Sequence, residues 1–388
     1  MKRSVVIFIM TICLSLAMVP TPIFASEVKL SLADNAKSAI LIERDTGAVL
    51  FEKNSDEKLS PASMTKIMTM LLIMEALDEG KIQLKEKVRT SEYAASMGGS
   101  QIFLEEGEEM TVEELLLAIS LGSANDASVA LAEKIAGSER NFVEMMNEKA
   151  KELGLKNTKF QNSTGLPAND HYSSAKDMAL LAKELLKHEN ITKYTSQYES
   201  YLRENTDKKF WLVNTNRLVK FYPGVDGLKT GYTNEAKYCL TATAKKNDMR
   251  VIAVVFGAST SKERNKQITQ MFDYAFSQFE TKQFYAKGDV LGKVKVEKGQ
   301  KRKIDMAAGE SVSLLAKKGE KMDKVKTKVK LNKNIAAPIK KGQEIGKIIL
   351  EKDGKIIAEN AVVANESVKP ASWWTLYKRA FSIFTKVE

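Results

Sequence analysis

The sequence predicts an α+β fold with a mainly antiparallel sheet. A hairpin pattern over Lys37–Glu52 is followed by several helical segments, and three more strand-like segments come after them, within Val225–Phe256. From about residue 283 the helical periodicity stops, and short alternating segments separated by turn residues take its place. We therefore expect a first domain over 26–282, a small all-β domain over 283–366 and a C-terminal amphipathic helix over 367–388.

The start of the chain, residues 1–25, has the features of a signal peptide. Lys2 and Arg3 form a charged start, Val5–Val19 is an apolar stretch, and Ile23-Phe24-Ala25 resembles a small-residue cleavage site. The apolar stretch is short for a spanning helix, and no other segment approaches about 18 uninterrupted apolar residues. The sequence therefore predicts an exported protein that begins near Ser26.

Lysine and arginine exceed aspartate and glutamate by 60 to 49, which gives a formal net charge of +11. No basic stripe interleaved with aromatic residues and no nucleic-acid motif accompanies this charge. For an exported protein, anionic lipid or cell-wall polymer is the expected partner, and nucleic acid is not.

Cysteine and histidine are too few for several kinds of site. Cys13 leaves with the predicted signal peptide, so Cys239 has no partner for an intramolecular disulfide. His171 and His188 are the only histidines, which argues against a histidine-rich zinc site, and neither lies in a recognisable context for a Ser-His-Asp triad. We expect no metal and no cofactor.

A β-hairpin is predicted before the first helix and an irregular segment after it. Residues 39–42 and 49–51 flank the turn Asp45-Thr46-Gly47. Residues 89–109 are punctuated by glycines, and we expect them to pack near the site as a loop.

The stretch from Ser60 to Leu72 is predicted to be a buried helix that carries a nucleophile and a base. Ser60 and Pro61 are typical of a helix start, and apolar residues then surround the helix almost completely. Ser63 and Lys66 lie three residues apart and share a face near the N-terminus. A desolvated, neutral amine there could take the hydroxyl's proton. Ser-x-x-Lys alone is a common chance pattern. Whether Ser63 and Lys66 are catalytic therefore depends on whether the other motifs of such a site follow in the right order.

A short polar connection, Ser123-Ala124-Asn125, lies between two apolar helices. The first of these begins at Thr111, with Glu114 completing a capping box, and the second begins near Asp126. By itself such a connection is typical of an ordinary helix cap. Helices are also expected at about 139–153 and 174–188, the latter with Ser174 and Asp177 as its capping box.

Lys229-Thr230-Gly231 is predicted to lie on an edge of the sheet. Strands are expected at 211–213, 225–232, 238–244 and 250–256, and an amphipathic helix over Met271–Phe279 closes this part of the chain. Because strand residues alternate faces, Lys229 and Gly231 share a side. Gly231 would let a substrate backbone approach closely, although a plain turn is the alternative.

The last segment, 370–388, has the pattern of an interfacial membrane helix. Aromatic and aliphatic residues gather on one helical face, with Thr375, Arg379 and Lys386 opposite. Aromatic residues suit the headgroup region and cations suit anionic lipid. A helix that packs on its own domain is the alternative.

Together, Ser63-x-x-Lys66, Ser123-x-Asn125 and Lys229-Thr230-Gly231 resemble the three motifs of the penicillin-recognising serine acyl-enzymes. Flanking residues narrow the resemblance to low-molecular-mass penicillin-binding proteins that are D-alanyl-D-alanine carboxypeptidases, and within them to the type of spore-forming bacilli; these flanks are 61–66, 122–127, 162–175 and 226–231. The resemblance covers essentially the whole chain. Ala124 stands where many members have glycine, and its side chain carries no chemistry.

The resemblance implies a β-lactamase/transpeptidase-like catalytic domain and a role for each site residue. Ser63 would attack the carbonyl between two D-alanines of a peptidoglycan stem, and Lys66, the general base, would take its proton. The backbone N–H groups of Ser63 and Tyr232 would form the oxyanion hole. The remaining roles are proton relay by Ser123, substrate positioning by Asn125, and binding of the terminal carboxylate by Lys229 and Thr230 with Arg264.

The resemblance also implies that β-lactams acylate Ser63, and that the protein sits on the outer face of the cytoplasmic membrane. Three other functions share these residues or this layout. A β-lactamase would need a dedicated deacylating base, for which we find no counterpart. A D,D-endopeptidase would use the same residues. A non-catalytic wall-binding protein would have no use for Ser63, Lys66, Ser123 and Lys229 together.

Overall fold

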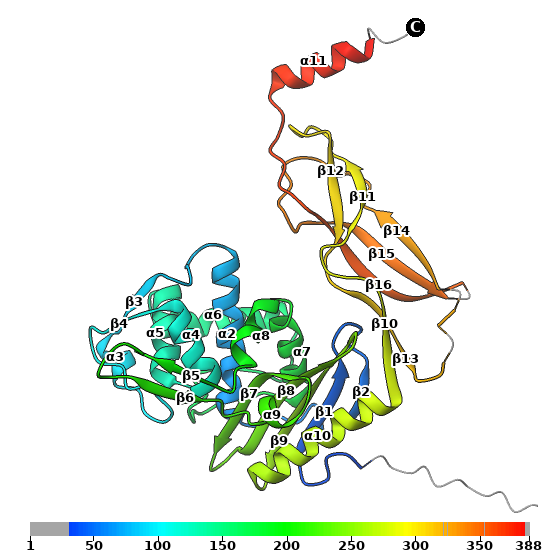
Figure 1. Ribbon diagram of the computed structural model, residues 1–388. Helices are drawn as coiled ribbons and strands as arrows, with labels where there is room; N and C mark the ends of the chain where they lie inside the picture. Colours follow the sequence, from blue (N-terminus) through cyan, green and yellow to red (C-terminus); the bar gives the residue numbers. More distant parts are fainter. Residues whose placement is uncertain (1–30, 321, 324, 353, 385–388) are drawn as a thin grey trace, which may run out of the picture. The chain divides into compact units, whose positions relative to one another are not determined.

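The computed structural model describes residues 31–320, 322–323, 325–352 and 354–384. The predicted signal peptide, 1–25, lies outside the described residues. The core of the first domain is a five-stranded antiparallel sheet in the order β2-β1-β9-β8-β7 (Figure 1). Its strands are β1 (Ser38–Glu43), β2 (Val49–Lys53), β7 (Val225–Thr233), β8 (Lys237–Lys246) and β9 (Met249–Ala258). The predicted hairpin and the late strands are thus confirmed, with β7 at an edge.

The two faces of the sheet contribute to two different cores. Ile40 and Ile42 of β1 pack among the helices of the helical region, whereas Ala39 and Leu41 pack against α10 (Ser261–Gln278). This division follows from the two-residue period of a strand, and it explains why β1 is an almost unbroken apolar run.

The helical region lies between β2 and β7 in the sequence (Figure 1). Its main helices are α2 (Lys66–Asp78), α4 (Val112–Gly122), α5 (Asn125–Ala136), α6 (Glu139–Glu152) and α7 (Ala175–Leu185). Short elements complete it: β3 (Lys87–Arg89), α3 (Glu92–Ala95), β4 (Glu109–Thr111), η2 (Glu189–Ile191), α8 (Thr192–Thr195), β5 (Glu199–Leu202), β6 (Phe210–Val213) and α9 (Leu218–Phe221).

Capping explains most helix starts, with two differences from the sequence prediction. Thr111 and Glu114 form the predicted capping box. At Ser174 only half of the predicted box forms: its hydroxyl accepts from the N–H of Asp177, while the Asp177 carboxylate accepts from Asn157 and Thr158. Helix α10 begins at Ser261, ten residues before the predicted Met271, and Thr260 caps it.

The first helix also starts differently from the prediction. Ser60 does not act as a cap; instead a 3-10 turn, η1 (Ala62–Thr65), precedes α2. Ala62 adopts a left-handed conformation at φ +46°, which sets the direction of the chain immediately before Ser63. This turn therefore fixes the position of the Ser63 side chain relative to α2.

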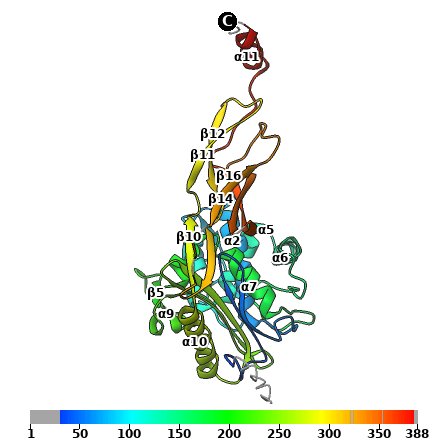
Figure 2. The ribbon, with the colours of Figure 1, turned by 90° about the vertical axis from the view of Figure 1, so that its right-hand side faces the viewer.

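The second part of the chain is all β, as predicted. Strands β10 (Phe279–Tyr285) and β13 (Val312–Lys317) pair with each other. A five-stranded antiparallel sheet has the order β11-β12-β16-β15-β14, and Figure 1 labels all of its strands. Figure 2 shows β11, β12, β14 and β16 after a rotation by 90°. Its strands are β11 (Val290–Lys295), β12 (Lys303–Ala308), β14 (Lys326–Leu331), β15 (Glu344–Lys352) and β16 (Lys355–Ala364), and they enclose a core of their own.

The described chain ends in α11 (Trp373–Phe384). Within the described ranges, no helix has both the length and the apolar character required to cross a membrane.

Candidate active site

Lys66 is the buried centre of a polar cluster at the start of α2. Its Nζ lies 3.2 Å from Ser63 Oγ, 2.7 Å from Asn125 Oδ1 and 2.6 Å from the carbonyl oxygen of Thr164. The side chain is fully buried, whereas Ser63 is only half-buried. The predicted Ser63–Lys66 pair is therefore in contact, and its hydroxyl is more exposed to solvent than its amine.

Burial is the main reason why the pKa of Lys66 lies well below its usual range, and the positive charge of Lys229 lowers it further, whereas Asp126 opposes the shift. Lys66 is therefore neutral over a larger part of the pH range than a lysine that is exposed to solvent. Two carbonyl oxygens take two of its N–H bonds, so its lone pair is left for the Ser63 proton.

The connection between α4 and α5 delivers Ser123 and Asn125 to the same place. Ser123 ends α4 in a left-handed conformation at φ +62°, and Asn125 opens α5. Asn125 accepts from Lys66 and donates to the carbonyl of Gly98 at 2.6 Å. The Ser123 hydroxyl is buried and has no hydrogen-bond partner among the described residues. An unpaired buried hydroxyl beside a nucleophile is a costly feature that a bound substrate would satisfy.

Strand β7 supplies Lys229, Thr230 and Gly231. Lys229 is buried, and burial, followed by the positive charge of Arg264, lowers its pKa to about 7. The Thr230 hydroxyl donates to Thr215 Oγ1 at 2.8 Å. A Cβ on Gly231 would lie 2.7 Å from the carbonyl oxygen of Pro61. The backbone that approaches Gly231 closely on this side is therefore that of Pro61, directly before η1, where a substrate backbone was predicted.

Arg264 and Tyr232 are the remaining predicted site residues. Arg264 projects from α10, and burial lowers its pKa to about 10, so it keeps its charge at neutral pH. Its guanidinium donates to Asn265 Oδ1. Tyr232 is half-exposed and its ring lies 4.6 Å from that of Tyr238.

One cavity of about 350 Å³ joins these residues. It contains Ser63, Ser123, Thr230, Gly231, Tyr232 and Arg264 in its wall, while Lys66, Asn125 and Lys229 are buried and do not line it. Sequence reasoning missed Ser100, Thr215 and Arg217, which also line it. Arg217 brings a second cation to the wall that already has Arg264, so the cavity suits an anionic end group.

The carbonyl of Thr164 is the other contact that the motifs did not reveal. It belongs to the segment 162–165, in which the carbonyls of Ser163 and Thr164 accept from Thr69 and Lys66 of α2. The next residue, Gly165, has φ +83°, and a Cβ there would lie 1.9 Å from the carbonyl oxygen of Ala62. Only glycine lets this segment pack so tightly on η1, and the packing places the carbonyl against Lys66.

His171 stabilises η1 through a hydrogen bond to Thr65. Its Nδ1 accepts from the backbone N–H of Gln161 at 3.2 Å, so Nε2 carries the proton and donates to Thr65 Oγ1 at 2.8 Å. Thr65 lies between Ser63 and Lys66 in the sequence. Burial lowers the pKa of His171 to about 4. The ring is therefore a neutral support for η1.

Acid should weaken the fold through His171. The unfolded chain takes up this proton near its usual pKa of about 6.5, whereas the folded chain resists protonation down to about 4. Stability is therefore present above about pH 6.5 and is lost as pH falls toward 4, by about 3 kcal/mol in all. Denaturant titrations across this range should show a shallower loss for His171→Gln than for the parent protein. Parallel curves for the two proteins would refute this role.

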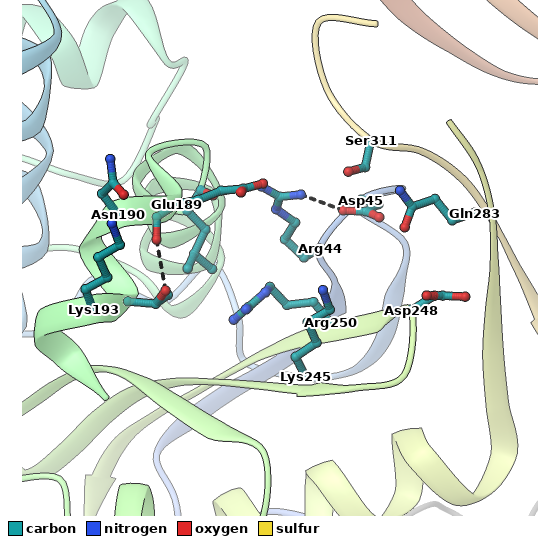
Figure 3. Close-up of a pocket in the computed structure, with 12 residues that line it drawn as sticks. Arg44, Asp45, Glu189, Asn190, Lys193, Lys245, Asp248, Arg250, Gln283 and Ser311 are labelled. Carbon is teal, nitrogen blue, oxygen red and sulfur yellow. Dashed lines mark hydrogen bonds and ion pairs between the residues drawn. The ribbon is translucent and has the colours of Figure 1, made fainter. Parts of the chain in front are cut away.

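A second cavity, of about 310 Å³, lies elsewhere (Figure 3). None of the predicted site residues lines it. Two of its arginines are already paired: Arg44 with Asp45 at 2.7 Å, and Arg250 with Asp226 through two hydrogen bonds of 2.8 and 2.7 Å. Its arginines are thus paired with carboxylates, whereas Arg264 beside Ser63 donates to the neutral side chain of Asn265. No group of side chains able to hold a metal ion occurs in the described parts of the chain.

Comparison with known proteins agrees with this geometry. The family model described as D-alanyl-D-alanine carboxypeptidase matches residues 25–260, and that of the penicillin-binding protein 5 C-terminal domain matches 279–370. D-alanyl-D-alanine carboxypeptidase DacF of Bacillus subtilis is 66% identical over 355 residues, covering 92% of this chain and 91% of that protein.

Solved structures give the same result. Penicillin-binding protein 5 from Haemophilus influenzae has a TM-score of 0.66 at 34% identity, over 86% of this chain and 98% of that one. Penicillin-binding protein D2 from Listeria monocytogenes, in its ampicillin-bound form, has a TM-score of 0.58 at 31% identity, over 64% and 100%. With its Ser-Lys pair, its Ser-Ala-Asn connection and its basic cavity wall, this chain belongs to the D-alanyl-D-alanine carboxypeptidase family of serine peptidases.

Proposed function

We propose that Ser63 is the nucleophile with which this chain, a serine-type D-alanyl-D-alanine carboxypeptidase, removes the terminal D-alanine from peptidoglycan stem peptides. The observation that carries the proposal is the 3.2 Å contact between a half-buried hydroxyl and a fully buried amine whose pKa is strongly lowered. A neutral amine can accept the proton that the hydroxyl must lose on attack.

The proposed steps are those of an acyl-enzyme mechanism. Ser63 Oγ bonds to the carbonyl carbon between the two D-alanines, and its proton passes to Lys66 Nζ. The backbone N–H groups of Ser63 and Tyr232 stabilise the oxyanion. As the C–N bond breaks, the nitrogen of the leaving D-alanine takes a proton relayed by the unpartnered Ser123 hydroxyl. Water then hydrolyses the ester and frees Ser63.

The carboxylate of the terminal D-alanine fits the cationic side of the cavity. Thr230 and Arg264 line it, and Lys229 is buried next to Thr230 in β7, where its charge interacts with that of Arg264. Charge-assisted hydrogen bonds to a carboxylate are stronger than neutral ones, which favours a substrate that ends in a free carboxylate. The same group is present in penicillins, and we propose that β-lactams acylate Ser63.

Incubation of the purified protein with a fluorescent penicillin, and separately with a peptide ending in D-Ala-D-Ala, tests this function. A stable label that maps to Ser63 by mass spectrometry, together with release of free D-alanine, is the expected result. Rapid loss of label with hydrolysed penicillin would indicate a β-lactamase instead. Neither label nor D-alanine would favour the non-catalytic wall-binding protein.

Substrate binding should weaken at alkaline pH. Lys229 has a pKa of about 7 in the free enzyme, so it is charged below that pH and neutral above it. We expect KM for a peptide with a free carboxylate to rise between about pH 7 and about pH 9, while a C-terminally amidated peptide shows no such trend. A KM that stays constant over this range would count against Lys229 as a carboxylate-binding group.

We also propose that α11 attaches the exported protein to the outer face of the cytoplasmic membrane. Four aromatic side chains on α11 are exposed by about half or more: Trp373, Trp374, Tyr377 and Phe381. Their rings stack along the helix, and Lys378 lies over the Trp374 ring. Exposed aromatics with nearby cations are typical of helices that lie in the membrane interface.

Deletion of residues 370–388 should release the protein from membranes without changing its activity on a soluble peptide. The measurement is sedimentation with vesicles that contain anionic lipid, beside a D-alanine assay. Trp373→Ser with Trp374→Ser should weaken sedimentation in the same direction. A truncated protein that still sediments would show that another surface holds the membrane.

A further inference from the structure

Phe103 combines three features that rarely occur together in a loop residue. It is a bulky side chain in the left-handed region, at φ +57°. Its ring is 65% exposed to solvent, so it gains little from core packing. It also belongs to the segment that contributes Ser100 to the catalytic cavity. Strained backbone at a bulky residue persists only where its surroundings enforce it, and it is concentrated at functional sites.

A buried carboxylate enforces this conformation. Asp126 accepts from the backbone N–H of Ile102, with its nearer oxygen at 3.0 Å, and from that of Leu104 at 3.1 Å. The two donors flank Phe103, so the peptide is clamped on both sides and the ring is directed outward. Arg203 adds a hydrogen bond to the Ile102 carbonyl at 3.0 Å. Asp126 directly follows Asn125, so the same short segment positions a catalytic amide and this ring.

Two segments that leave the cavity meet again at Phe103. One runs from Ser100 to Phe103, and the other runs back along β6 from Thr215 to Phe210. The rings of Phe103 and Phe210 touch edge to face, with centroids 6.0 Å apart. Three residues of chain span at most about 10 Å, so the Cα of Phe103 lies within about that distance of the Cα of Ser100, which lines the cavity.

We propose that Phe103, supported by Phe210, is a specificity-determining residue that binds the aliphatic side chain of the stem residue preceding D-Ala-D-Ala. The proposal rests on the proposed carboxypeptidase reaction at Ser63. In peptidoglycan stems this residue is a diamino acid, whose methylene chain is apolar over most of its length. One peptide unit plus an extended side chain gives a reach of about 10 Å from the scissile carbonyl, which is of the same order as the length of chain between Ser100 and Phe103.

The chemistry favours this occupant over a second protein. The substrate already places its D-alanines in the cavity, so the next residue has to lie on a surface continuous with it. The exposed aromatic surface here is small, and a methylene chain packs on a ring face without needing hydrogen-bond partners. The ring is held in advance by Asp126, so binding orders no loop.

Two acyl-peptides of different side-chain length test the proposal with the intact protein. One is diacetyl-L-lysyl-D-Ala-D-Ala, and the other is acetylglycyl-D-Ala-D-Ala. We expect Phe103→Ala to lower kcat/KM on the lysyl peptide by about tenfold, mostly through KM, and to change it less than about twofold on the glycyl peptide. Phe103→Leu should recover most of the loss. Tyr201→Ala, an exposed aromatic on the opposite face of the β5–β6 hairpin, is the matched control and should behave like the parent.

The second measurement is the rate of acylation by 6-aminopenicillanic acid, which has the β-lactam ring but no acyl side chain, and this rate should be unchanged in Phe103→Ala. Equal losses on both peptides, or a parallel loss with this β-lactam, would mean that Phe103 only supports the Asn125 loop, and the proposal would be wrong. No loss on either peptide, or a loss confined to polymeric peptidoglycan, would also overturn it. If the parent protein releases D-alanine from neither peptide, the reaction at Ser63 is what fails.

Discussion

Ser63→Ala should abolish both D-alanine release and covalent labelling by penicillin, while leaving the fold intact. The Ser63 hydroxyl is the group that forms the acyl-enzyme. Among the described residues that line the cavity, it is the one with a hydrogen bond to Lys66 Nζ. Loss of the nucleophile in serine hydrolases lowers kcat by about four orders of magnitude or more. The measurement is D-alanine release under single-turnover and steady-state conditions, with gel fluorescence for the label.

The variant should still bind substrate, because the cationic wall is untouched. Lys229 and Arg264 keep their positions, so a peptide should bind Ser63→Ala with an affinity close to that of the parent. Ser277→Ala, an exposed serine on α10, is the matched control and should retain full activity. D-alanine release by Ser63→Ala at the parent's rate would refute the assignment of the nucleophile.

Local patterns predicted the elements that carry the site. The all-round apolar helix, the Thr111–Glu114 box and the alternating strands follow from rules that act within one turn or one strand. The three motifs identified Ser63, Lys66, Ser123, Asn125 and Lys229, which the structure brings together at one cavity, on its wall or buried behind it.

Contacts between distant segments could not be predicted in the same way. Thr164 meets Lys66 through a backbone carbonyl across 98 positions of sequence, and a carbonyl has no sequence signature. The start of α10 was missed because Arg264 and Gln267 occupy core-facing positions, which breaks the apolar period. Asp126 seemed a mere helix start, yet it clamps the loop that carries Phe103. The clue was its place directly after the Ser-x-Asn motif.

Lys66→Met should lower the rate of acylation by about 10²–10⁴-fold while leaving a folded protein. Methionine matches the length of the lysine stem but cannot accept a proton. Its effect on stability has two opposing parts: a buried amine is removed, and the carbonyls of Asn125 and Thr164 lose their donor. We therefore expect a melting temperature within a few degrees of the parent's.

The pH profile separates this role from simple packing. In the parent, acylation at a saturating concentration of penicillin should become faster as pH rises and Lys66 loses its proton, since burial and Lys229 lower its pKa. Saturation removes the opposing effect of Lys229, whose loss of charge weakens carboxylate binding. Lys66→Met should show no such rise. Lys66→Arg should also fail at every pH, because a guanidinium keeps its proton and its positive charge in the buried position. An arginine variant as active as the parent would mean that Lys66 supplies charge alone, and the proton from Ser63 would need another acceptor.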